Sequence, residues 1–157
     1  PNIINRGISG DVTYGVLNRL PFILSQKPKK IFLAIGVNDI KRGASINEIS
    51  RNHERIIKLI RENSANTKLY VQSILPVNEV MLADIYAKIT NDRVAKANEK
   101  LKELTQKYNC TYIDLHQSKL KGDDGQLKKE LSTDGLHLQP SAYILWANYL
   151  KSLKHIR

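Results

Sequence analysis

Residues 30–35, which read KIFLAI, decide the fold that this sequence adopts. After the first lysine every position is apolar, without the polar alternation of a strand that has one face in water. Such continuous apolar runs are typical of parallel strands that are covered on both faces. Residues 68–74 form a similar run, and shorter ones lie at residues 2–5 and 111–115. We expect these four segments to be strands of one parallel sheet.

Helical patterns lie between and after these predicted strands, at residues 12–20, 45–60, 90–108 and 140–150. Ser45 and Glu48 have the spacing of a capping box, which marks the start of the second pattern. Pro140 suits the first turn of the last helix, and Pro21 is expected either to kink the first helix or to open a further turn. Strands that alternate with helices predict an α/β fold, in which helices cover both faces of a parallel sheet.

Length and composition indicate one globular domain. A chain of 157 residues can bury a core without disulfides or metals, and its single cysteine excludes an internal disulfide. The longest apolar runs are far too short to cross a membrane. The four histidines show no ligand spacing among themselves, and the glycines form no phosphate-binding loop. The sequence therefore predicts neither a metal site nor a nucleotide cofactor.

The net charge of +10 raises the question of an anionic partner. The lysines are scattered over the polar faces of predicted helices and loops, and no aromatic residues interleave with them to stack on bases. We therefore favour a solvated basic surface and expect no nucleic-acid partner. Charge-driven binding of DNA or RNA is kept as a weaker hypothesis, which predicts an affinity that falls steeply with added salt.

Three short segments carry side chains suited to acyl chemistry. Asp134 precedes His137 by three residues, so one turn can bring the carboxylate to the imidazole and leave the other ring nitrogen free as a base. Asn38 follows a glycine at a strand end, where its amide can donate to an oxyanion, and Gly7 can add a backbone N–H. Parallel sheets form their sites at the carboxyl ends of strands. Residues 75–89 are irregular and are expected to form a loop over this site.

Each of these segments also fits ordinary turn chemistry, because Gly, Asn and Asp are common where strands end. A lone histidine such as His137 is more often packed at a helix start than catalytic. Asp39 is expected to hold its loop by accepting backbone N–H groups, and Asp11 to cap the helix that follows it. The position of all three segments beyond strand ends is what favours a site.

Residues 5–11 (NRGISGD), 36–39 (GVND) and 134–138 (DGLHL) resemble the second, third and fifth sequence blocks of the SGNH hydrolases, also called GDSL-type esterases. Within that family the chain is most similar to the platelet-activating-factor acetylhydrolase-like branch, from residue 2 to about residue 150. The resemblance implies a three-layer α/β/α sandwich with a parallel, flavodoxin-like sheet.

The resemblance also implies roles and a substrate. Asp134 and His137 would be the acid and base of a catalytic triad, and Gly7 and Asn38 would donate to the oxyanion. The implied activity is hydrolysis of carboxylic esters through an acyl-enzyme, with no metal or organic cofactor. Short acyl groups, acetyl especially, on a sugar or lipid alcohol are the implied substrates.

The nucleophilic serine of this family lies in a Gly-Asp-Ser block after its first strand, and residues 1–157 contain no such block. Ser9 lies inside the second-block match, and Ser73 lacks a glycine turn that would expose its hydroxyl. We expect residues 1–157 to be a single, N-terminally incomplete SGNH-hydrolase-like domain, with the first strand and the serine upstream or on an associated piece. The alternative is a catalytically inactive binding module on the same fold. The sequence leaves the cellular compartment and oligomeric state undecided.

Overall fold

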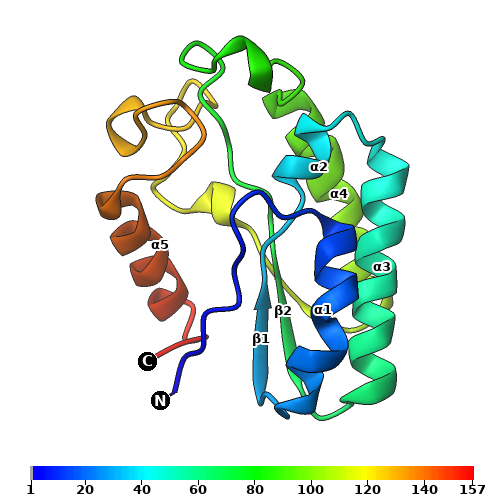
Figure 1. Ribbon diagram of the computed structural model, residues 1–157. Helices are drawn as coiled ribbons and strands as arrows, with labels where there is room; N and C mark the ends of the chain where they lie inside the picture. Colours follow the sequence, from blue (N-terminus) through cyan, green and yellow to red (C-terminus); the bar gives the residue numbers. More distant parts are fainter. Residues whose placement is uncertain (1) are drawn as a thin grey trace.

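The computed structural model, which describes residues 2–157, contains a parallel sheet of three strands (Figure 1). The strands are β1 (Lys30–Leu33), β2 (Lys68–Gln72) and β3 (Thr111–Ile113), and they lie in that order. The register places Phe32 opposite Tyr70 and Val71 opposite Tyr112. The predicted parallel sheet is confirmed, although each of these strands ends two residues before its apolar run does.

Residues 2–5 do not form the strand that we expected. They are irregular, none of the three strands pairs with them, and the residues Ile3 and Ile4 are 82% and 60% exposed. In Figure 1 this segment runs along the side of the sheet on which β1 has a free edge. The backbone of a strand needs a hydrogen-bonded neighbour, and the described chain supplies none here. The prediction is wrong because an apolar pattern does not reveal whether such a neighbour exists.

Within the described residues, the α-helices are α1 (Thr13–Ser25), α2 (Val37–Lys41), α3 (Ile46–Asn63), α4 (Asn91–Lys107) and α5 (Pro140–Ser152), with 3-10 turns at η1 (Asp84–Tyr86), η2 (Leu115–Gln117) and η3 (Lys129–Leu131). The start predicted at Ser45 is confirmed, since its side chain accepts from the Glu48 N–H at 3.1 Å. Helix α1 continues past Pro21 to its end at Ser25 and is therefore longer than expected. No helix of residues 2–157 is both long and apolar enough to span a membrane.

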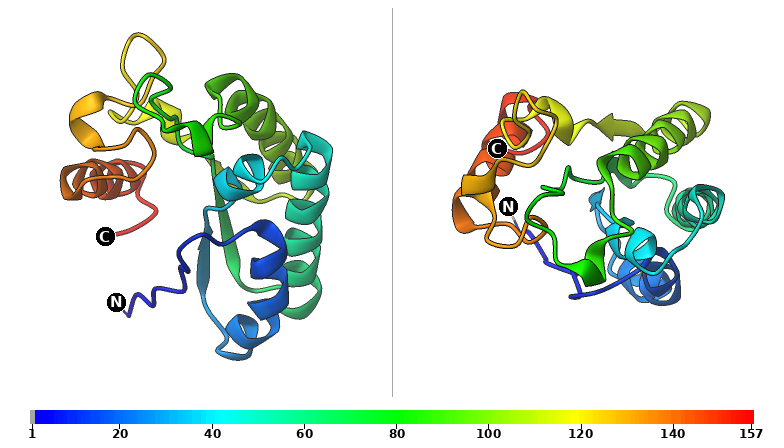
Figure 2. Two further views of the ribbon diagram at one scale, coloured as in Figure 1. Left: turned by 45° about the horizontal axis from the view of Figure 1, so that its top comes forward. Right: turned by 90° about the horizontal axis from the view of Figure 1, so that it is seen from above.

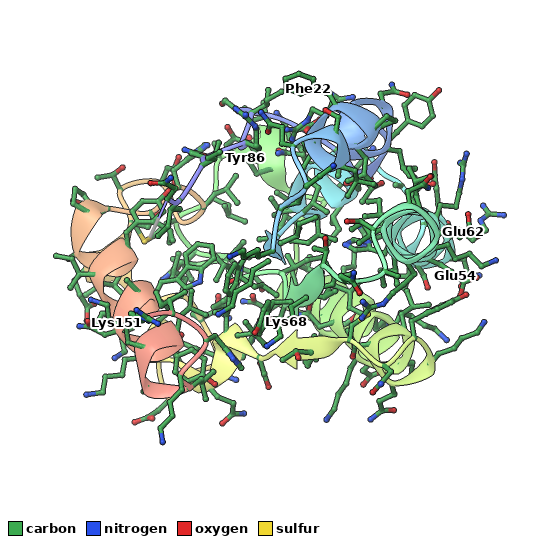
Figure 3. All side chains as sticks on the ribbon, turned by 90° about the horizontal axis from the view of Figure 1, so that it is seen from below. Phe22, Glu54, Glu62, Lys68, Tyr86 and Lys151 are labelled. Carbon is green, nitrogen blue, oxygen red and sulfur yellow. The ribbon has the colours of Figure 1, made fainter. Side chains whose placement is uncertain are left out.

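Helices cover both faces of the sheet, as the alternation of strands and helices predicts. Helices α1, α3 and α4 lie on one side, and α5 lies on the other (Figure 1, Figure 2). Seen from below in Figure 3, α3 with Glu54 and Glu62 and α5 with Lys151 stand on opposite sides of Lys68, the first residue of β2. The molecule therefore has the α/β architecture that the sequence indicates.

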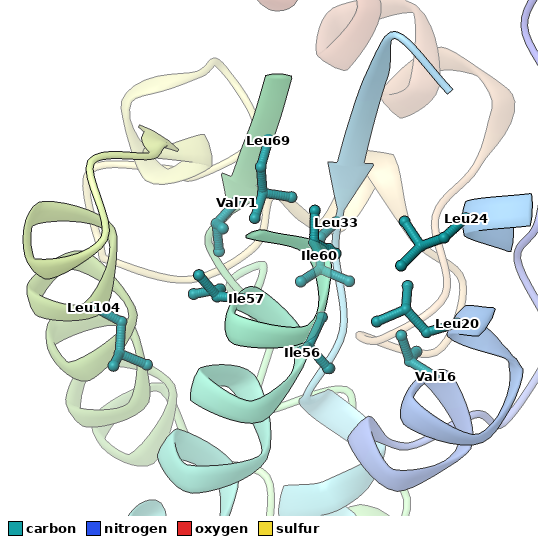
Figure 4. Close-up of a cluster of buried hydrophobic side chains, with 10 residues drawn as sticks. All are labelled: Val16, Leu20, Leu24, Leu33, Ile56, Ile57, Ile60, Leu69, Val71 and Leu104. Carbon is teal, nitrogen blue, oxygen red and sulfur yellow. The ribbon is translucent and has the colours of Figure 1, made fainter. Parts of the chain in front are cut away.

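The largest core cluster lies between the sheet and helices α1 and α3 (Figure 4). It consists of Val16, Leu20, Leu24, Leu33, Ile56, Ile57, Ile60, Leu69, Val71 and Leu104. On the opposite face, Trp146 Nε1 donates to Gln72 Oε1 at 2.8 Å, which anchors α5 to β2. The rings of Phe32 and Tyr70 stack there with their centroids 4.6 Å apart. The sheet is thus fixed from both sides, which holds the ends of its strands in place.

Substitution of Ile57 by alanine is expected to lower the free energy of unfolding by about 2–5 kcal/mol, because Ile57 is fully buried and its loss leaves a cavity between α3 and the sheet. The matched control is Lys58→Ala, an exposed position one residue further along α3, which should change the same quantity by less than about 0.5 kcal/mol. Urea unfolding followed by circular dichroism measures both variants. Equal effects of the two substitutions would contradict the assignment of this cluster as the main core.

Candidate active site

The candidate segments gather at the carboxyl ends of the strands. In Figure 1 the turn that follows Gly7, helix α2, residues 75–89 and residues 130–139 all lie at this end of the sheet. Figure 2 shows the same group from above. Parallel strands bring their carboxyl ends to one edge, so segments that are far apart in the sequence meet there. The irregular loop expected at residues 75–89 is confirmed, since its one regular element is the short turn η1.

Asp134 and His137 form a hydrogen-bonded pair. Nδ1 of the imidazole lies 2.6 Å from Oδ2 of the carboxylate. An ionised carboxylate can only accept, so Nδ1 carries the proton and Nε2 of the neutral ring is free to act as a base. The side chain of His137 is 67% exposed, which leaves the imidazole open to a ligand.

The surrounding turn holds the Asp134 carboxyl in its ionised form. Burial raises the pKa of Asp134, but the hydrogen bond from His137 and the backbone N–H groups of Leu136 and His137 outweigh it and lower that pKa to about 2. These N–H groups donate to Oδ1 at 2.9 and 2.8 Å. Asp134 is therefore a carboxylate throughout the neutral range, as an orienting partner of histidine must be.

Ser132 organises the turn from inside and was not singled out by the sequence. It is 3% exposed, and its hydroxyl donates to the His137 carbonyl at 2.6 Å and accepts from the Gly135 N–H at 2.9 Å. Gly135 has a φ of +85°, and a Cβ there would lie 2.5 Å from the carbonyl oxygen of Asn78. A serine two residues before an Asp-Gly pair is a local turn signal that could have identified this role.

Gly7 and Asn38, the two predicted oxyanion donors, are hydrogen-bonded to residues other than Asp134 and His137. The Gly7 N–H donates to Asn5 Oδ1 at 2.8 Å, and Asn38 Nδ2 donates to the Asp11 carbonyl at 3.1 Å. The second bond joins α2 to the segment that contains Gly7. Over residues 2–157 no hydrogen bond links either donor to the Asp134–His137 pair. The structure therefore connects the two candidate donor segments to each other rather than to the acid–base pair.

A buried carboxylate fixes α2, the helix that carries Asn38. Asp39 is 5% exposed and accepts from the Thr13 N–H at 3.0 Å and from its hydroxyl at 2.6 Å. Asn52 on α3 donates in turn to the Thr13 hydroxyl at 2.9 Å. The expectation that Asp39 accepts a backbone N–H is confirmed, although the donor lies on α1. This network joins α1, α2 and α3 directly beneath Asn38.

Asp11 is not the helix cap that we expected. The N-cap position of α1 is Val12, without a side-chain cap hydrogen bond. Asp11 instead accepts from the Val12 N–H at 2.9 Å and forms an ion pair with Arg19 Nη2 at 2.6 Å. The cap prediction is wrong because the carboxylate finds a charged partner two helical turns away, which a local pattern does not reveal.

Gly36 allows the chain to turn from β1 into α2. Its φ is +134°, and a Cβ there would lie 2.7 Å from Ile74 Cδ1 and 3.6 Å from His53 Cε1. His53 is 1% exposed, and its Nδ1 donates to the Ile49 carbonyl at 2.9 Å. Burial lowers the pKa of His53, which keeps the ring neutral. His53 therefore packs behind the site and has no access to a ligand.

Neither serine considered from the sequence has a nucleophile's surroundings. Ser73 is 1% exposed, and its hydroxyl accepts from the Leu115 N–H at 2.9 Å, so it fastens the start of η2 to the end of β2. Ser9 lies in an exposed turn. Among residues 2–157 there is also no group of three or more His, Cys, Asp or Glu side chains that could hold a metal ion.

The parallel sheet covered by helices on both faces defines an α/β protein, and comparison with known proteins identifies its family. The model of the GDSL-like Lipase/Acylhydrolase family matches residues 1–145. The chain belongs to this family, so its resemblance to the SGNH hydrolases is confirmed. A Streptococcus pneumoniae structure, provisionally described as a platelet activating factor, is 35% identical with a TM-score of 0.86, over 96% of this chain and 71% of that one.

Three further proteins share the fold or part of the sequence. A Bacteroides fragilis structure, provisionally described as an acylhydrolase, shares the fold at 21% identity, with a TM-score of 0.82 over 96% of this chain and 73% of that one. An N-acylneuraminate cytidylyltransferase of Streptococcus agalactiae is 29% identical over 152 residues, which are 92% of this chain and 34% of the relative. The chain thus spans about a third of that relative's length. An arylesterase of Vibrio mimicus is 37% identical over 93 residues, 55% of this chain and 46% of the relative.

The ionised state of Asp134 predicts a pH dependence of stability. A carboxyl whose pKa falls from 3.8 to about 2 on folding stabilises the protein above pH 3.8 and loses that contribution as the pH falls through about 2. The difference in free energy of unfolding between wild type and Asp134→Asn should therefore narrow as the pH drops below about 4. Urea unfolding of both proteins between pH 6 and pH 3 measures this difference in free energy of unfolding. Asp92→Asn, in the exposed pair with Lys96, is the control and should show a smaller difference throughout.

Gly135→Ala is expected to destabilise the protein by more than Gly125→Ala. Both glycines have positive φ, +85° and +79°, so both substitutions impose a cost of about 1 kcal/mol or more. Only at Gly135 would the new Cβ also meet the Asn78 carbonyl oxygen, because nothing lies within 4 Å at Gly125. Thermal unfolding of the two variants gives the comparison. Equal losses would mean that contact with Asn78 does not constrain the turn.

Proposed function

We propose that this protein hydrolyses carboxylic esters through an acyl-enzyme intermediate. The observation that carries the proposal is the Asp134–His137 pair, joined at 2.6 Å and open to solvent at the carboxyl ends of the strands. Membership of the GDSL-like lipase and acylhydrolase family supports it, as does the similarity to an arylesterase. An ionised carboxylate and a histidine with a free Nε2 are the acid and base that acyl transfer to serine requires.

In the proposed reaction a serine hydroxyl attacks the ester carbonyl while His137 Nε2 takes its proton. The tetrahedral intermediate collapses, the bond from carbon to the alcohol oxygen breaks, and His137 returns the proton to the leaving alcohol. Water then attacks the acyl-enzyme with His137 again as base, which releases the acid and restores the serine. Asp134 stays ionised and stabilises the imidazolium in each half-reaction.

We propose that Gly7 N–H and Asn38 Nδ2 stabilise the oxyanion. Both donors are at present hydrogen-bonded to neutral oxygens, on Asn5 and Asp11. A negatively charged oxygen is the stronger acceptor, and bonds to it are roughly twice as strong as bonds between neutral groups. The substrate oxygen would therefore displace both partners as charge develops, which is the differential stabilisation that lowers a barrier.

We infer that the nucleophile is a serine outside residues 1–157, in a preceding segment or an associated piece. The burial of Ser73 and the exposed turn around Ser9 support this inference. The free edge of β1 supports it too, since an added strand would pair there and would cover the exposed Ile3 and Ile4.

A short acyl group, acetyl especially, on a sugar or lipid alcohol is the substrate class that we propose. The name of the Streptococcus agalactiae relative refers to a sugar, and the description of the Streptococcus pneumoniae structure refers to a lipid mediator. Either alcohol would leave after protonation by His137. No metal or organic cofactor takes part in the proposed steps.

His137→Ala is expected to lower kcat/KM for p-nitrophenyl acetate by a factor on the order of 10⁶ in the full natural chain, because no other base would accept the serine proton. His155→Ala is the matched control. His155 lies near the start of β1, where its carbonyl accepts from Lys30 Nζ at 2.9 Å, and its loss should leave the rate within about twofold. Unchanged hydrolysis by His137→Ala would overturn the proposal.

A fluorophosphonate probe and intact-mass analysis locate the nucleophile. The proposal predicts an adduct on a serine outside residues 1–157. An adduct on Ser9 or Ser73 would overturn the assignment of the nucleophile. Absence of an adduct, with reversible binding of an acetylated sugar and no turnover, would favour the binding-module alternative.

A further inference from the structure

We propose that Lys41 and Tyr86 form a subsite for a negatively charged group on the alcohol side of the ester. The preferred substrates would then be acyl esters of alcohols that carry a carboxylate or a phosphate. This inference rests on the proposed ester hydrolysis and narrows its substrate class. It also gives a role to the high net charge, which none of the proposed catalytic steps uses.

The two side chains connect α2 to the acid–base pair. Tyr86, in η1, presents its ring nearly perpendicular to the imidazole of His137, at 74° and with the centroids 6.4 Å apart. Lys41 is the last residue of α2, and its Nζ lies 5.0 Å from the centroid of the Tyr86 ring. In Figure 1 the short helix turn η1, which carries Tyr86, lies above α2 at the carboxyl ends of the strands. Because both contacts involve the same tyrosine ring, the lysine ammonium and the imidazole lie on groups that flank one aromatic side chain.

Lys41 is a charge without a counter-ion. None of the ion pairs found within residues 2–157 includes it. The side chain is half-buried, and its cation rests on the aromatic ring of Tyr86. Cation–π contact holds an ammonium in place while its remaining N–H groups stay available to an acceptor. A fixed, unpaired cation beside the site is suited to binding an anion.

The chemistry of the leaving group puts this cation on the alcohol side. His137 returns its proton to the leaving alcohol, so that oxygen must come within hydrogen-bond distance of Nε2. The rest of the alcohol then extends along the groups that flank the imidazole, and Tyr86 is one of them. An anionic substituent on the alcohol can then reach Lys41 across the tyrosine ring, while the carbonyl oxygen of the ester would accept from the proposed oxyanion donors.

The net positive charge of the whole chain also favours the binding of anionic substrates. A net charge of +10 attracts anions over long distances and raises their local concentration near the protein. Lys41 would then bind, at the site, an anionic substrate that the net positive charge has attracted to the protein. Salt weakens both effects, because the Debye length falls from about 30 Å at 0.01 M to about 3 Å at 1 M.

Three acetylated sugars of similar size test the proposal in the full natural chain: a neutral methyl glucoside, a methyl glucuronide and a glucose 6-phosphate. The wild type should show at least about tenfold higher kcat/KM for one of the charged esters than for the neutral one, which corresponds to about 1.4 kcal/mol. Preference for the glucuronide identifies a carboxylate, and preference for the sugar phosphate a phosphate. Lys41→Gln should remove most of this preference through KM, and added salt should reduce it.

Two further variants sharpen the test. Tyr86→Phe keeps the aromatic face and should keep the preference, whereas Tyr86→Leu should lower it. Lys68→Gln removes an equal charge at the opposite end of β2 and should leave the preference unchanged. Equal kcat/KM for all three esters, or equal loss in the Lys41 and Lys68 variants, would overturn the subsite.

Binding measurements separate this inference from the proposed function. Calorimetry with glucuronic acid, glucose 6-phosphate and glucose needs no turnover. At least tenfold tighter binding of one anionic sugar by the wild type, lost in Lys41→Gln, would support the subsite even if no ester were hydrolysed. Equal binding of charged and neutral sugars would overturn it even if esters were hydrolysed.

Discussion

The parallel pairing of β1 with β2 is the constraint on which the rest of this structure depends. Because the two strands run in the same direction, the chain must return through α3, and each strand must deliver its next residues to the same edge of the sheet. Helix α2 and the loop at residues 75–89 meet at that edge, and the turn that holds Asp134 and His137 joins them (Figure 1). Helices packed on both faces hold the strands in place, because the core between α1, α3 and the sheet resists displacement. The segments at the carboxyl ends of the strands therefore keep fixed positions relative to one another.

The turn at residues 132–137 shows how a small element serves two purposes at once. Asp134 uses one carboxylate oxygen to close the turn, by accepting two backbone N–H groups, and the other to orient the imidazole. The same bonds that give the turn its shape therefore stabilise the ionised carboxylate. Ser132 supports both functions from a buried position, and Gly135 supplies the backbone conformation that no other residue type adopts as readily. The hydrogen bonds to Asp134 thus both shape the turn and lower the pKa of its carboxyl.

The sequence allowed the features that depend on local patterns to be predicted. The strands β1, β2 and β3, the start of α3 at Ser45 and the Asp134–His137 pairing all follow from periodicity, capping or short spacing. Features that depend on distant partners were missed. Asp11 pairs with Arg19 instead of capping α1, and α2 exists because Gly36 turns the chain and Thr13 binds Asp39. Residues 2–5 have a strand-like composition, but hydrogen bonding to a neighbour, which composition does not encode, decides whether a strand forms.

The network of Asp39, Thr13 and Asn52 has a consequence for how such a protein evolves. It ties the helix that carries Asn38 to two long helices of the core, through buried bonds between Thr13 and Asp39 and a partly buried bond from Asn52. Sequence drift on the surfaces of α1 and α3 leaves those bonds untouched, so the position of the amide is robust to neutral change. The loop that carries Tyr86 is held at its two ends, where Val77 and Ile89 are buried among residues of α2, α3 and α4. Between these ends it exposes Val80 and Ile85. Diversification among descendants should therefore concentrate in the exposed middle of that loop, while the Asn38 amide is inherited with the scaffold.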